Sequence, residues 1–481
     1  MGGTGGRRRV CAAAGIAPPR GMALSGGRIR FVSARGRTGG AADDEAAGWG
    51  ACRHAAHRVA LTGETDSGVL VSTPDLRPSL RSILEGLHES GYLSQVVTTL
   101  ALRSQRLDQL GGVPLLGGGL RQLLGRRELP AFLEGKTTCV WSRELLRAAV
   151  SRTGRQRLTH AVWKWAELGF DAAVARRFGG RYAFVYGMEH SCAATFATQK
   201  ASGGRNILRQ VTAHGRTLAA VLRREAERFP QYVTPYYRML LREADDIIAR
   251  KEREYALADL IVANSDYVRQ TFVDNGVDPA KVVAIPTGCP SVDPIGARAG
   301  EGSGPLRFIC VGSLSLRKGF PYLLEAWRAP RVGPAAELWV AGPCEIPVGN
   351  ALAHEPGLRY LGVLNKDELR QTMRDCDVMV LPTLCEGLAH SVLEAMAVGL
   401  PVITTVESGA GWLIEHGVNG LIVPASSVEH LAAAMGQALA LRPTLAEMGA
   451  RSAERAGSWT VAQANQAHWG AVEHFLETGA G

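Results

Sequence analysis

Two glutamates, Glu386 and Glu394, stand at the start of an apolar segment and inside it. Glu394 is the one acid within residues 388–400, where most other side chains suit a helix core. On a helix, His390 and Glu394 lie one turn apart and form a polar stripe with Ser391. Carboxylates in a crevice can hold the hydroxyls of a sugar or ribose through charge-assisted hydrogen bonds. The alternative for Glu394 is a solvated position on a helix surface.

A second candidate site is the loop at residues 312–319, GSLSLRKG, which carries Arg317 and Lys318 side by side. The loop follows an apolar strand pattern that ends at Val311, and it precedes a helix with Pro321 in its first turn. Backbone N–H groups and the positive end of a helix dipole favour an anion there, and the two cations add full charge. A diphosphate fits this loop, although an exposed basic turn explains the loop alone equally well.

Two further groups have chemistry that depends on their placement. His214 follows the strand pattern of residues 206–213, so we expect its imidazole to face a cleft between domains, while a structural histidine remains the alternative. Asp375 and Asp377 form a DxD sequence of the kind that binds a metal and a diphosphate in other transferases. Here they join a helix end to a buried strand, so we predict that they cap a turn.

These residues must be positioned by strands that alternate with helices. Residues 258–265 and residues 376–383 share one pattern, in which a small residue and an Asp precede an apolar strand with a polar exit. One such unit in each half predicts two similarly wound α/β domains, each with a parallel sheet. Ligands bind at the carboxyl ends of strands in such sheets, which is where Lys318 and Glu386 fall.

We therefore predict four parts of the chain. Residues 1–66 are rich in Gly, Ala and Arg and are expected to be a disordered leader. Residues 67–288 form an acceptor-side domain, and residues 289–458 form a donor domain. Residues 459–481 form a last helix that packs back on the first domain.

The composition is that of a globular protein, with 46% hydrophobic and 21% charged residues among 481. Nine singly scattered cysteines without a CxxC pair argue against a disulfide framework or a zinc site. No run reaches the roughly 18 apolar residues of a membrane span. We expect a cytoplasmic protein, with peripheral contact at the inner membrane face left open. The net charge of +9 fits phosphorylated substrates or an anionic surface, and no nucleic-acid partner is expected.

One segment of the first half, residues 111–181, is mostly helical in pattern and locally basic. Arginines outnumber acids along it. An insertion that touches an acceptor or a membrane is one interpretation. A solvated basic helical face is the other.

Taken together, the motifs resemble those of family 4 glycosyltransferases, which are retaining enzymes with the GT-B fold. That fold has two Rossmann-like domains whose parallel sheets face each other across a cleft. The resemblance is dense over residues 258–424, weakens through the first half and is absent from the leader. It rests on GSLSLRKG at 312–319, EGLAHSVLEAMA at 386–397, GLPVI at 399–403 and GVNG at 417–420.

The resemblance implies roles on the donor side. Arg317 and Lys318, in the loop that Gly312 opens, would bind the donor diphosphate, and Glu394 would bind the nucleotide ribose. A nucleoside diphosphate sugar is then a substrate, and no cofactor or bound metal is implied.

The transferred sugar would be held by other residues. The resemblance assigns it to Glu386 and to the backbone of the next residues, which are Gly387, Leu388 and Ala389. His214 matches a first-domain histidine that contacts the sugar near its reacting carbon. We count His214, Glu386 and Lys318 as the catalytic residues.

Three positions depart from the family pattern. Ser313 stands where an Arg often follows the first Gly of the loop, so Arg317 is its expected substitute. Trp412 stands at a common Glu. The glycine-rich acceptor loop after the first strand is replaced by residues 72–75, STPD.

The resulting hypothesis is a retaining glycosyltransferase of hexosyltransferase type that acts on a hydroxyl acceptor, which is a glycan, a lipid-linked molecule or a small molecule. The altered acceptor loop leaves open a non-catalytic GT-B subunit that binds or scaffolds during glycan assembly. Phosphorolysis of a glycan on the same fold is a third possibility, and it would bring a cofactor-bearing lysine.

Overall fold

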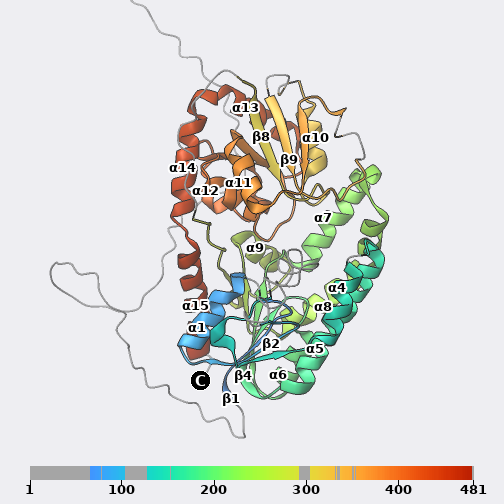
Figure 1. Cartoon of the computed structure of the whole chain (residues 1–481), viewed down its shortest axis with the longest axis vertical. Helices are drawn as coiled ribbons and strands as arrows, with labels where there is room; N and C mark the ends of the chain where they lie inside the picture. Colours follow the sequence, from blue (N-terminus) through green and yellow to red (C-terminus); the bar gives the residue numbers. More distant parts are fainter. Residues whose placement is uncertain are drawn as a thin grey trace, which may run out of the picture. The chain divides into compact units, whose positions relative to one another are not determined.

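The computed structural model describes residues 66–76, 78–102, 127–151, 153–291, 304–330, 332, 336–348, 352 and 354–478. The expected leader lies outside the described residues apart from Asp66, which begins the first strand. Two parallel sheets organise the described chain (Figure 1). The prediction of two α/β domains with parallel sheets is therefore confirmed.

The first sheet has seven strands in the order β3-β2-β1-β4-β5-β6-β7. Its central strands are apolar and buried on both faces, as helix-covered parallel strands must be. The three-residue strands β3 and β7 are too short for periodicity to reveal them. The strands are β1 (Asp66–Ser72), β2 (Leu93–Thr98), β3 (Thr137–Cys139), β4 (Tyr182–Met188), β5 (Arg205–Gln210), β6 (Leu260–Ala263) and β7 (Val282–Ala284).

Helices cover both faces of this sheet, and several begin at a recognisable cap. Thr234 caps α8 with Pro235 in the first turn, and Ser265 caps α9 through the Val268 amide. The helices are α1 (Pro78–Glu89), α4 (Ser142–Ser151), α5 (Gln156–Phe178), α6 (Ala193–Ala201), α7 (Gly215–Arg228), α8 (Pro235–Leu257) and α9 (Asp266–Asp274).

The second sheet has six strands in the order β10-β9-β8-β11-β12-β13. Strands β8 and β11 lie side by side at its centre, and the loops after them carry Lys318 and Glu386. The strands are β8 (Leu306–Val311), β9 (Ala336–Ala341), β10 (Leu358–Gly362), β11 (Val378–Leu381), β12 (Val402–Thr404) and β13 (Gly420–Ile422). The helices are α10 (Phe320–Trp327), α11 (Lys366–Arg374), α12 (His390–Ala397), α13 (Val428–Ala440), α14 (Leu445–Gly457) and α15 (Val461–Thr478).

Helix α15 follows the second sheet in the chain but packs on the first. Trp469 lies against Gly86 of α1, where a Cβ atom would meet the indole ring at 2.8 Å. The hydroxyl of Tyr186 on β4 lies 3.0 Å from His468 Nε2. Val472 is fully buried in the same core, so α15 completes one face of the first sheet (Figure 1).

Candidate functional site

The loop between β8 and α10 closes on its own hydrogen bonds. The Lys318 amide donates to Ser315 Oγ at 3.3 Å. The Gly319 and Phe320 amides donate to the carbonyls of Leu316 and Ser315, at 3.0 and 3.2 Å. Because these amides at the start of α10 are engaged within the loop, its cationic side chains are the groups left to meet an anion.

Glycines let this loop approach its neighbours. Gly319 has a left-handed φ of 70°, and a Cβ atom there would lie 1.9 Å from the Pro382 carbonyl oxygen. Gly312 has a φ of 141°, and its backbone lies beside the side chain of Lys318. The Lys318 side chain is therefore positioned by packing as well as by charge.

Arg317 and Lys318 converge on the carboxylate of Glu386. Lys318 Nζ lies 2.8 Å from Glu386 Oε1, and Arg317 forms an ion pair with the same oxygen. Arg317 Nη1 also donates to the Cys385 carbonyl at 3.0 Å. The side chains of Lys318 and Glu386 are 14% and 11% exposed, so both remain reachable by a ligand. Two cations on one carboxylate leave a net positive charge, which favours an incoming anion.

The turn after Glu386 contacts the carboxyl edge of the first sheet. A Cβ atom on Gly387 would lie 1.7 Å from the Val211 carbonyl oxygen and 2.8 Å from Asn264 Nδ2. Ser265 Oγ donates to the Gly387 carbonyl. Only glycine fits this approach, and the turn thereby brings the donor-side residues next to the ends of β5 and β6.

The next two residues of the turn are buried, and one of their amides is engaged. Leu388 and Ala389 are 4% and 1% exposed. The Ala389 amide donates to the Ser408 carbonyl at 2.8 Å. That amide is therefore engaged in holding the turn to the following loop, and the predicted backbone contact to a sugar is left to Gly387 and Leu388.

Glu394 lies on α12, one turn after His390. Burial raises the pKa of its carboxyl, while Lys366 and Arg370 of α11 act in the opposite direction. Desolvation lowers the pKa of His390 at the start of the same helix, with Glu386 opposing that shift. Helix α12 thus presents polar side chains along one face beside Glu386, as its sequence predicts.

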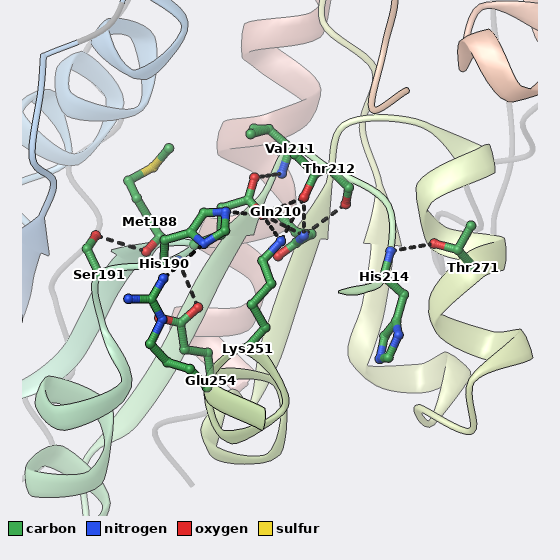
Figure 2. Close-up of polar contacts among 12 residues, drawn as sticks. Met188, His190, Ser191, Gln210, Val211, Thr212, His214, Lys251, Glu254 and Thr271 are labelled. Atoms are coloured by element: carbon green, nitrogen blue, oxygen red, sulfur yellow. Dashed lines mark hydrogen bonds and ion pairs between the residues drawn. The ribbon is translucent and has the colours of Figure 1, made fainter. Parts of the chain in front are cut away.

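The structure corrects the expected placement of His214. Strand β5 ends at Gln210, and His214 caps α7 by accepting the Arg216 amide on Nδ1 at 3.3 Å. Its ring is 2% exposed and packs on Tyr255 and Phe272, with centroids 4.9 and 5.1 Å away. Figure 2 shows the imidazole directed away from Thr212. The expectation that it faces a cleft is wrong, because the aromatic pair draws the ring into the first-domain core.

Burial also changes the chemistry available to His214. It lowers the pKa of the imidazole to about 4, so the ring is neutral near pH 7. Of the DxD pair, Asp375 is the C-cap residue of α11, whereas Asp377 accepts the Arg307 amide of β8 at 2.8 Å and so ties the chain to the neighbouring strand. Among the described residues, no group of three or more His, Cys, Asp or Glu side chains is arranged to hold a metal ion.

Comparison with known proteins finds a family match in the second half of the chain. Residues 305–440 match a family model described as glycosyl transferases group 1. The match covers both the 312–319 loop and the Glu386 turn, and it confirms the family resemblance of the motifs.

Curated relatives resemble about a third of the chain. The amylovoran biosynthesis glycosyltransferase AmsK of Erwinia amylovora is 33% identical over 141 residues, which cover 27% of this chain and 35% of AmsK. A GDP-mannose-dependent phosphatidylinositol monomannoside mannosyltransferase of Mycobacterium tuberculosis is 32% identical over 168 residues, which cover 32% of this chain and 43% of the relative. The chain therefore spans less than half the length of these relatives.

Solved structures resemble the chain over both sheets. Sucrose-phosphate synthase of Thermosynechococcus elongatus has a TM-score of 0.53 at 17% identity, covering 86% of this chain and 100% of its own. HepE of Anabaena with UDP-glucose has a TM-score of 0.51 at 17% identity, covering 85% of this chain and 99% of its own. Such likenesses concern the fold, and together with the two parallel sheets they confirm GT-B.

Opposite the glycosyltransferase domain, the first sheet carries a buried ion pair that sequence reasoning missed. Lys251 Nζ lies 2.9 Å from Glu189 Oε2, and these side chains are 3% and 5% exposed. Gln210 and Thr212 also donate to Glu189, at 2.8 and 2.7 Å. Burial alone would raise the pKa of Glu189, but Lys251, His190 and the hydrogen bond from Thr212 hold it at about 2. Glu189 directly follows β4, and that polar exit was its one signal in the sequence.

A cavity of about 340 Å³ opens at the same carboxyl edge. Val211 lines it, and the Val211 carbonyl is also the group that approaches Gly387, so the cavity adjoins the donor-side turn. Its wall comes from the ends of the five strands β1 to β5 and from α4 and α5. The residues that matter below are Asp75, Arg143, Arg147, Trp163, Glu167 and His190.

Two features of this cavity depart from ordinary structure. His190 adopts a left-handed φ of 75°, while its amide donates to Glu254 at 2.9 Å. Burial raises the pKa of Glu167, which lines the cavity, to about 8, and that of Glu254, which is fully buried behind His190, to about 7. Strain and carboxyls that titrate near neutrality are typical of functional sites, so this cavity is a candidate substrate site.

Proposed function

We propose that the protein transfers a sugar from a nucleoside diphosphate donor to a hydroxyl acceptor, with retention at the anomeric carbon. The observation that carries the proposal is the convergence of Arg317 and Lys318 on Glu386, inside a matched glycosyltransferase domain and beside the first sheet. The donor classes named for the relatives support this class of donor, since one relative is GDP-mannose-dependent and one neighbour was solved with UDP-glucose.

The donor diphosphate would take the place of Glu386 as the partner of the two cations. Its charge grows as the bond between the sugar and the phosphate breaks, and Arg317 and Lys318 would stabilise that charge. Glu386, released from its cations, would then accept hydrogen bonds from sugar hydroxyls. Glu394 would hold the ribose from α12, the helix that follows Glu386. No metal enters this scheme.

Retention follows if attack and departure occur on one face of the sugar. The acceptor oxygen forms the new glycosidic bond as the old bond breaks, and its proton passes to the leaving phosphate oxygen. Glu386 would therefore orient the sugar rather than attack it. The neutral, buried His214 has no proton-transfer role in this scheme.

The acceptor would enter from the first-domain side. The cavity beside Val211 supports this, because it adjoins the turn that holds Glu386 and Gly387. Asp75, at the loop that replaces the glycine-rich acceptor loop, lines the same cavity. A hydroxyl placed there would lie next to the donor sugar.

The test is an initial-rate screen of UDP, GDP and ADP sugars, with hydrolysis counted when no acceptor is known. Once a donor is found, Lys318→Ala should lower kcat/KM by about 10²- to 10³-fold, because a preorganised charge on the leaving group is lost. Glu394→Ala should also lower turnover by orders of magnitude through the ribose. Near-normal rates in both variants would contradict the roles proposed for Lys318 and Glu394.

The matched control is Arg328→Ala. Arg328 lies at the end of α10 and pairs with Glu355, away from the loop that carries Lys318. Its removal should leave turnover unchanged. Product stereochemistry, read from the anomeric proton coupling by NMR, tests retention separately, since an inverted product would overturn retention and leave transfer standing.

A further inference from the structure

Large apolar side chains are exposed at one place far more than elsewhere. Six of the nine that are exposed in the described residues lie between positions 141 and 168. They are Trp141, Leu145, Leu146, Leu158, Trp165 and Leu168, each between 42% and 55% exposed. An apolar patch of this kind on a globular protein marks a surface that binds another protein or a membrane.

The exposed residues follow the helical repeat. On α5, Leu158, Ala161, Trp165 and Leu168 recur every three or four residues and all face outward. On α4, Leu145 stands four residues after Trp141, which directly precedes the helix. Helix α5 already buries Ala166, Phe170, Ala173 and Val174 on its inward side, so the outward residues form a second apolar face, which a surface helix of a globular protein normally lacks.

The two stripes join into one surface because α4 and α5 are in close contact. The Arg143 guanidinium lies 4.2 Å from the centroid of the Trp165 ring and donates to the Trp165 carbonyl at 2.8 Å. A Cβ atom on Gly169 would lie 1.7 Å from Arg143 Nη1, so the glycine makes room for this contact. We call the outward faces of α4 and α5, with Trp141, the hairpin surface (Figure 1).

The exposed charges on α4 and α5 themselves have one sign, although Glu243 of the neighbouring α8 pairs with Lys164. Within the described residues 141–178, every carboxylate is buried or half-buried, namely those of Glu144, Glu167 and Asp171. The fully exposed charges are all arginines, namely Arg155, Arg157, Arg176 and Arg177. A second cavity, of about 400 Å³, continues from Arg157 to Arg238 and Arg242 of α8. Exposed Trp and Leu flanked by Arg match an interfacial helix on anionic lipid.

We propose that the hairpin surface lies on an anionic lipid bilayer, and that the 340 Å³ cavity receives the head group of a lipid-borne hydroxyl acceptor. The same helices serve both purposes, since Trp163, Arg147 and Glu167 point to the cavity while Trp165 and Leu168 face outward. The acceptor class rests on the proposed glycosyl transfer, whereas the bilayer contact stands without it. Within the described residues, no helix has both the length and the apolar content to cross a bilayer, so the contact is interfacial.

The test is sedimentation of the full chain with phosphatidylglycerol vesicles and, separately, with phosphatidylcholine vesicles. We expect binding to the anionic vesicles that weakens with salt, because arginines near a charged surface are screened. A triple variant, Leu158→Ser, Trp165→Ser and Leu168→Ser, should weaken partitioning by about tenfold or more. Arg176→Gln with Arg177→Gln should weaken it less and should flatten the salt dependence.

The control changes an exposed apolar residue elsewhere. Val363 is 74% exposed and lies in the second domain, so Val363→Ser should bind vesicles as the parent protein does. Circular dichroism checks that each variant is folded. Equal vesicle binding by the triple variant and the parent protein would overturn the proposal. So would a dimer in sedimentation equilibrium that the triple variant abolishes, with no vesicle binding, because a second copy would then cover the hairpin surface.

Binding of UDP and GDP to the same preparations separates this proposal from the proposed function. Nucleotide binding without vesicle binding overturns the bilayer contact and leaves glycosyl transfer intact. Vesicle binding without nucleotide binding overturns the donor assignment and leaves the bilayer contact intact. With both present, a transfer rate that rises when the acceptor alcohol is carried on anionic vesicles supports the lipid-borne acceptor, and an equal rate with a water-soluble alcohol overturns it.

Discussion

Each sheet has a lysine–glutamate ion pair at its carboxyl edge, and the two pairs differ in what surrounds them. Lys251 and Glu189 are 2.9 Å apart, and Lys318 and Glu386 are 2.8 Å apart. The first pair is almost wholly buried, and Glu189 accepts three further hydrogen bonds from its own domain. The second pair is partly exposed, and Arg317 is a second cation on the same carboxylate. The ion pair of the first sheet is therefore shielded from ligands, whereas the ion pair of the second sheet can exchange partners with a ligand.

The difference shows how a GT-B chain can fix one domain edge while leaving the other ready for a ligand. A buried pair cannot trade partners without leaving a charge unpaired, which costs several kcal/mol. The open pair can release Lys318 and Arg317 to a diphosphate because that anion supplies equal or greater charge. We therefore expect substitutions at the first pair to affect stability and those at the second to affect turnover.

The sharpest test of that division is Lys251→Met. It leaves the Glu189 carboxylate buried without its cation, so we expect the free energy of unfolding to fall by about 3–5 kcal/mol. Urea unfolding followed by circular dichroism measures it. The double variant Lys251→Met with Glu189→Gln should recover part of the loss, since no charge then remains buried. Lys318→Ala, by contrast, should shift the unfolding free energy by no more than about 1 kcal/mol. Equal destabilisation by both lysine variants would contradict the division.

The next largest effect is expected where the two edges touch. Gly387→Ala would place a Cβ atom 1.7 Å from the Val211 carbonyl oxygen, which belongs to the backbone and cannot turn aside as a side chain can. Because that contact aligns the Glu386 turn with the first sheet, a displacement of about 1 Å should lower kcat/KM by about 10²-fold. Gly411→Ala is the matched control, since its Cβ atom would meet nothing closer than 3.5 Å. Comparable kinetic losses in the two variants would show that the contact does not set alignment.

The donor half of this comparison could be read from the sequence. Lys318 and Glu386 each come soon after an apolar strand, and the carboxyl ends of neighbouring parallel strands meet at one edge. The pattern of residues close together in the sequence is sufficient to place Lys318 and Glu386. Gly387 is equally local, although its need for Val211 is visible only in three dimensions.

The side chains of the first domain are positioned by contacts between residues far apart in the sequence, and their sequence signals are weak. The direction of His214 is set by Tyr255 and Phe272, which lie on α8 and α9, so its place after a strand misleads. Lys251 reaches Glu189 from a helix whose sequence looks merely polar. The hairpin surface includes a second, outward apolar face of α5, and periodicity gives the repeat of a helix without saying which side faces the core.

Buried polar groups at the strand ends extend the contrast between the two sheets. Thr404 and Thr405, at the end of β12, donate to the carbonyls of Leu381 and Thr383 at 2.7 and 2.6 Å. At the end of β5, Gln210 keeps a buried amide oxygen to which no described residue donates a hydrogen bond. These two threonine hydroxyls at the end of β12 are thus satisfied, whereas Gln210 at the end of β5 retains hydrogen-bonding capacity.

The smallest expected effect concerns Glu167 in the cavity. Its folded pKa is about 8, raised mainly by burial from a usual 4.5, so between these values the folded state holds a proton that the unfolded state lacks. Its contribution to stability is fully present below pH 4.5 and is lost as the pH rises to about 8. The pKa of His214, lowered to about 4, has the opposite effect only below about pH 6.5. The raised pKa of Glu254, about 7, acts in the same direction as that of Glu167 but its effect is complete by about pH 7.5, so unfolding should be measured between pH 7.5 and 8.5. We expect the unfolding free energy of the parent protein to fall across this range by about 1 kcal/mol per pH unit, and Glu167→Gln to flatten that slope. The exposed Glu89→Gln should leave the slope unchanged, and a parent-like slope in Glu167→Gln would mean that this carboxyl is already ionised in the folded cavity.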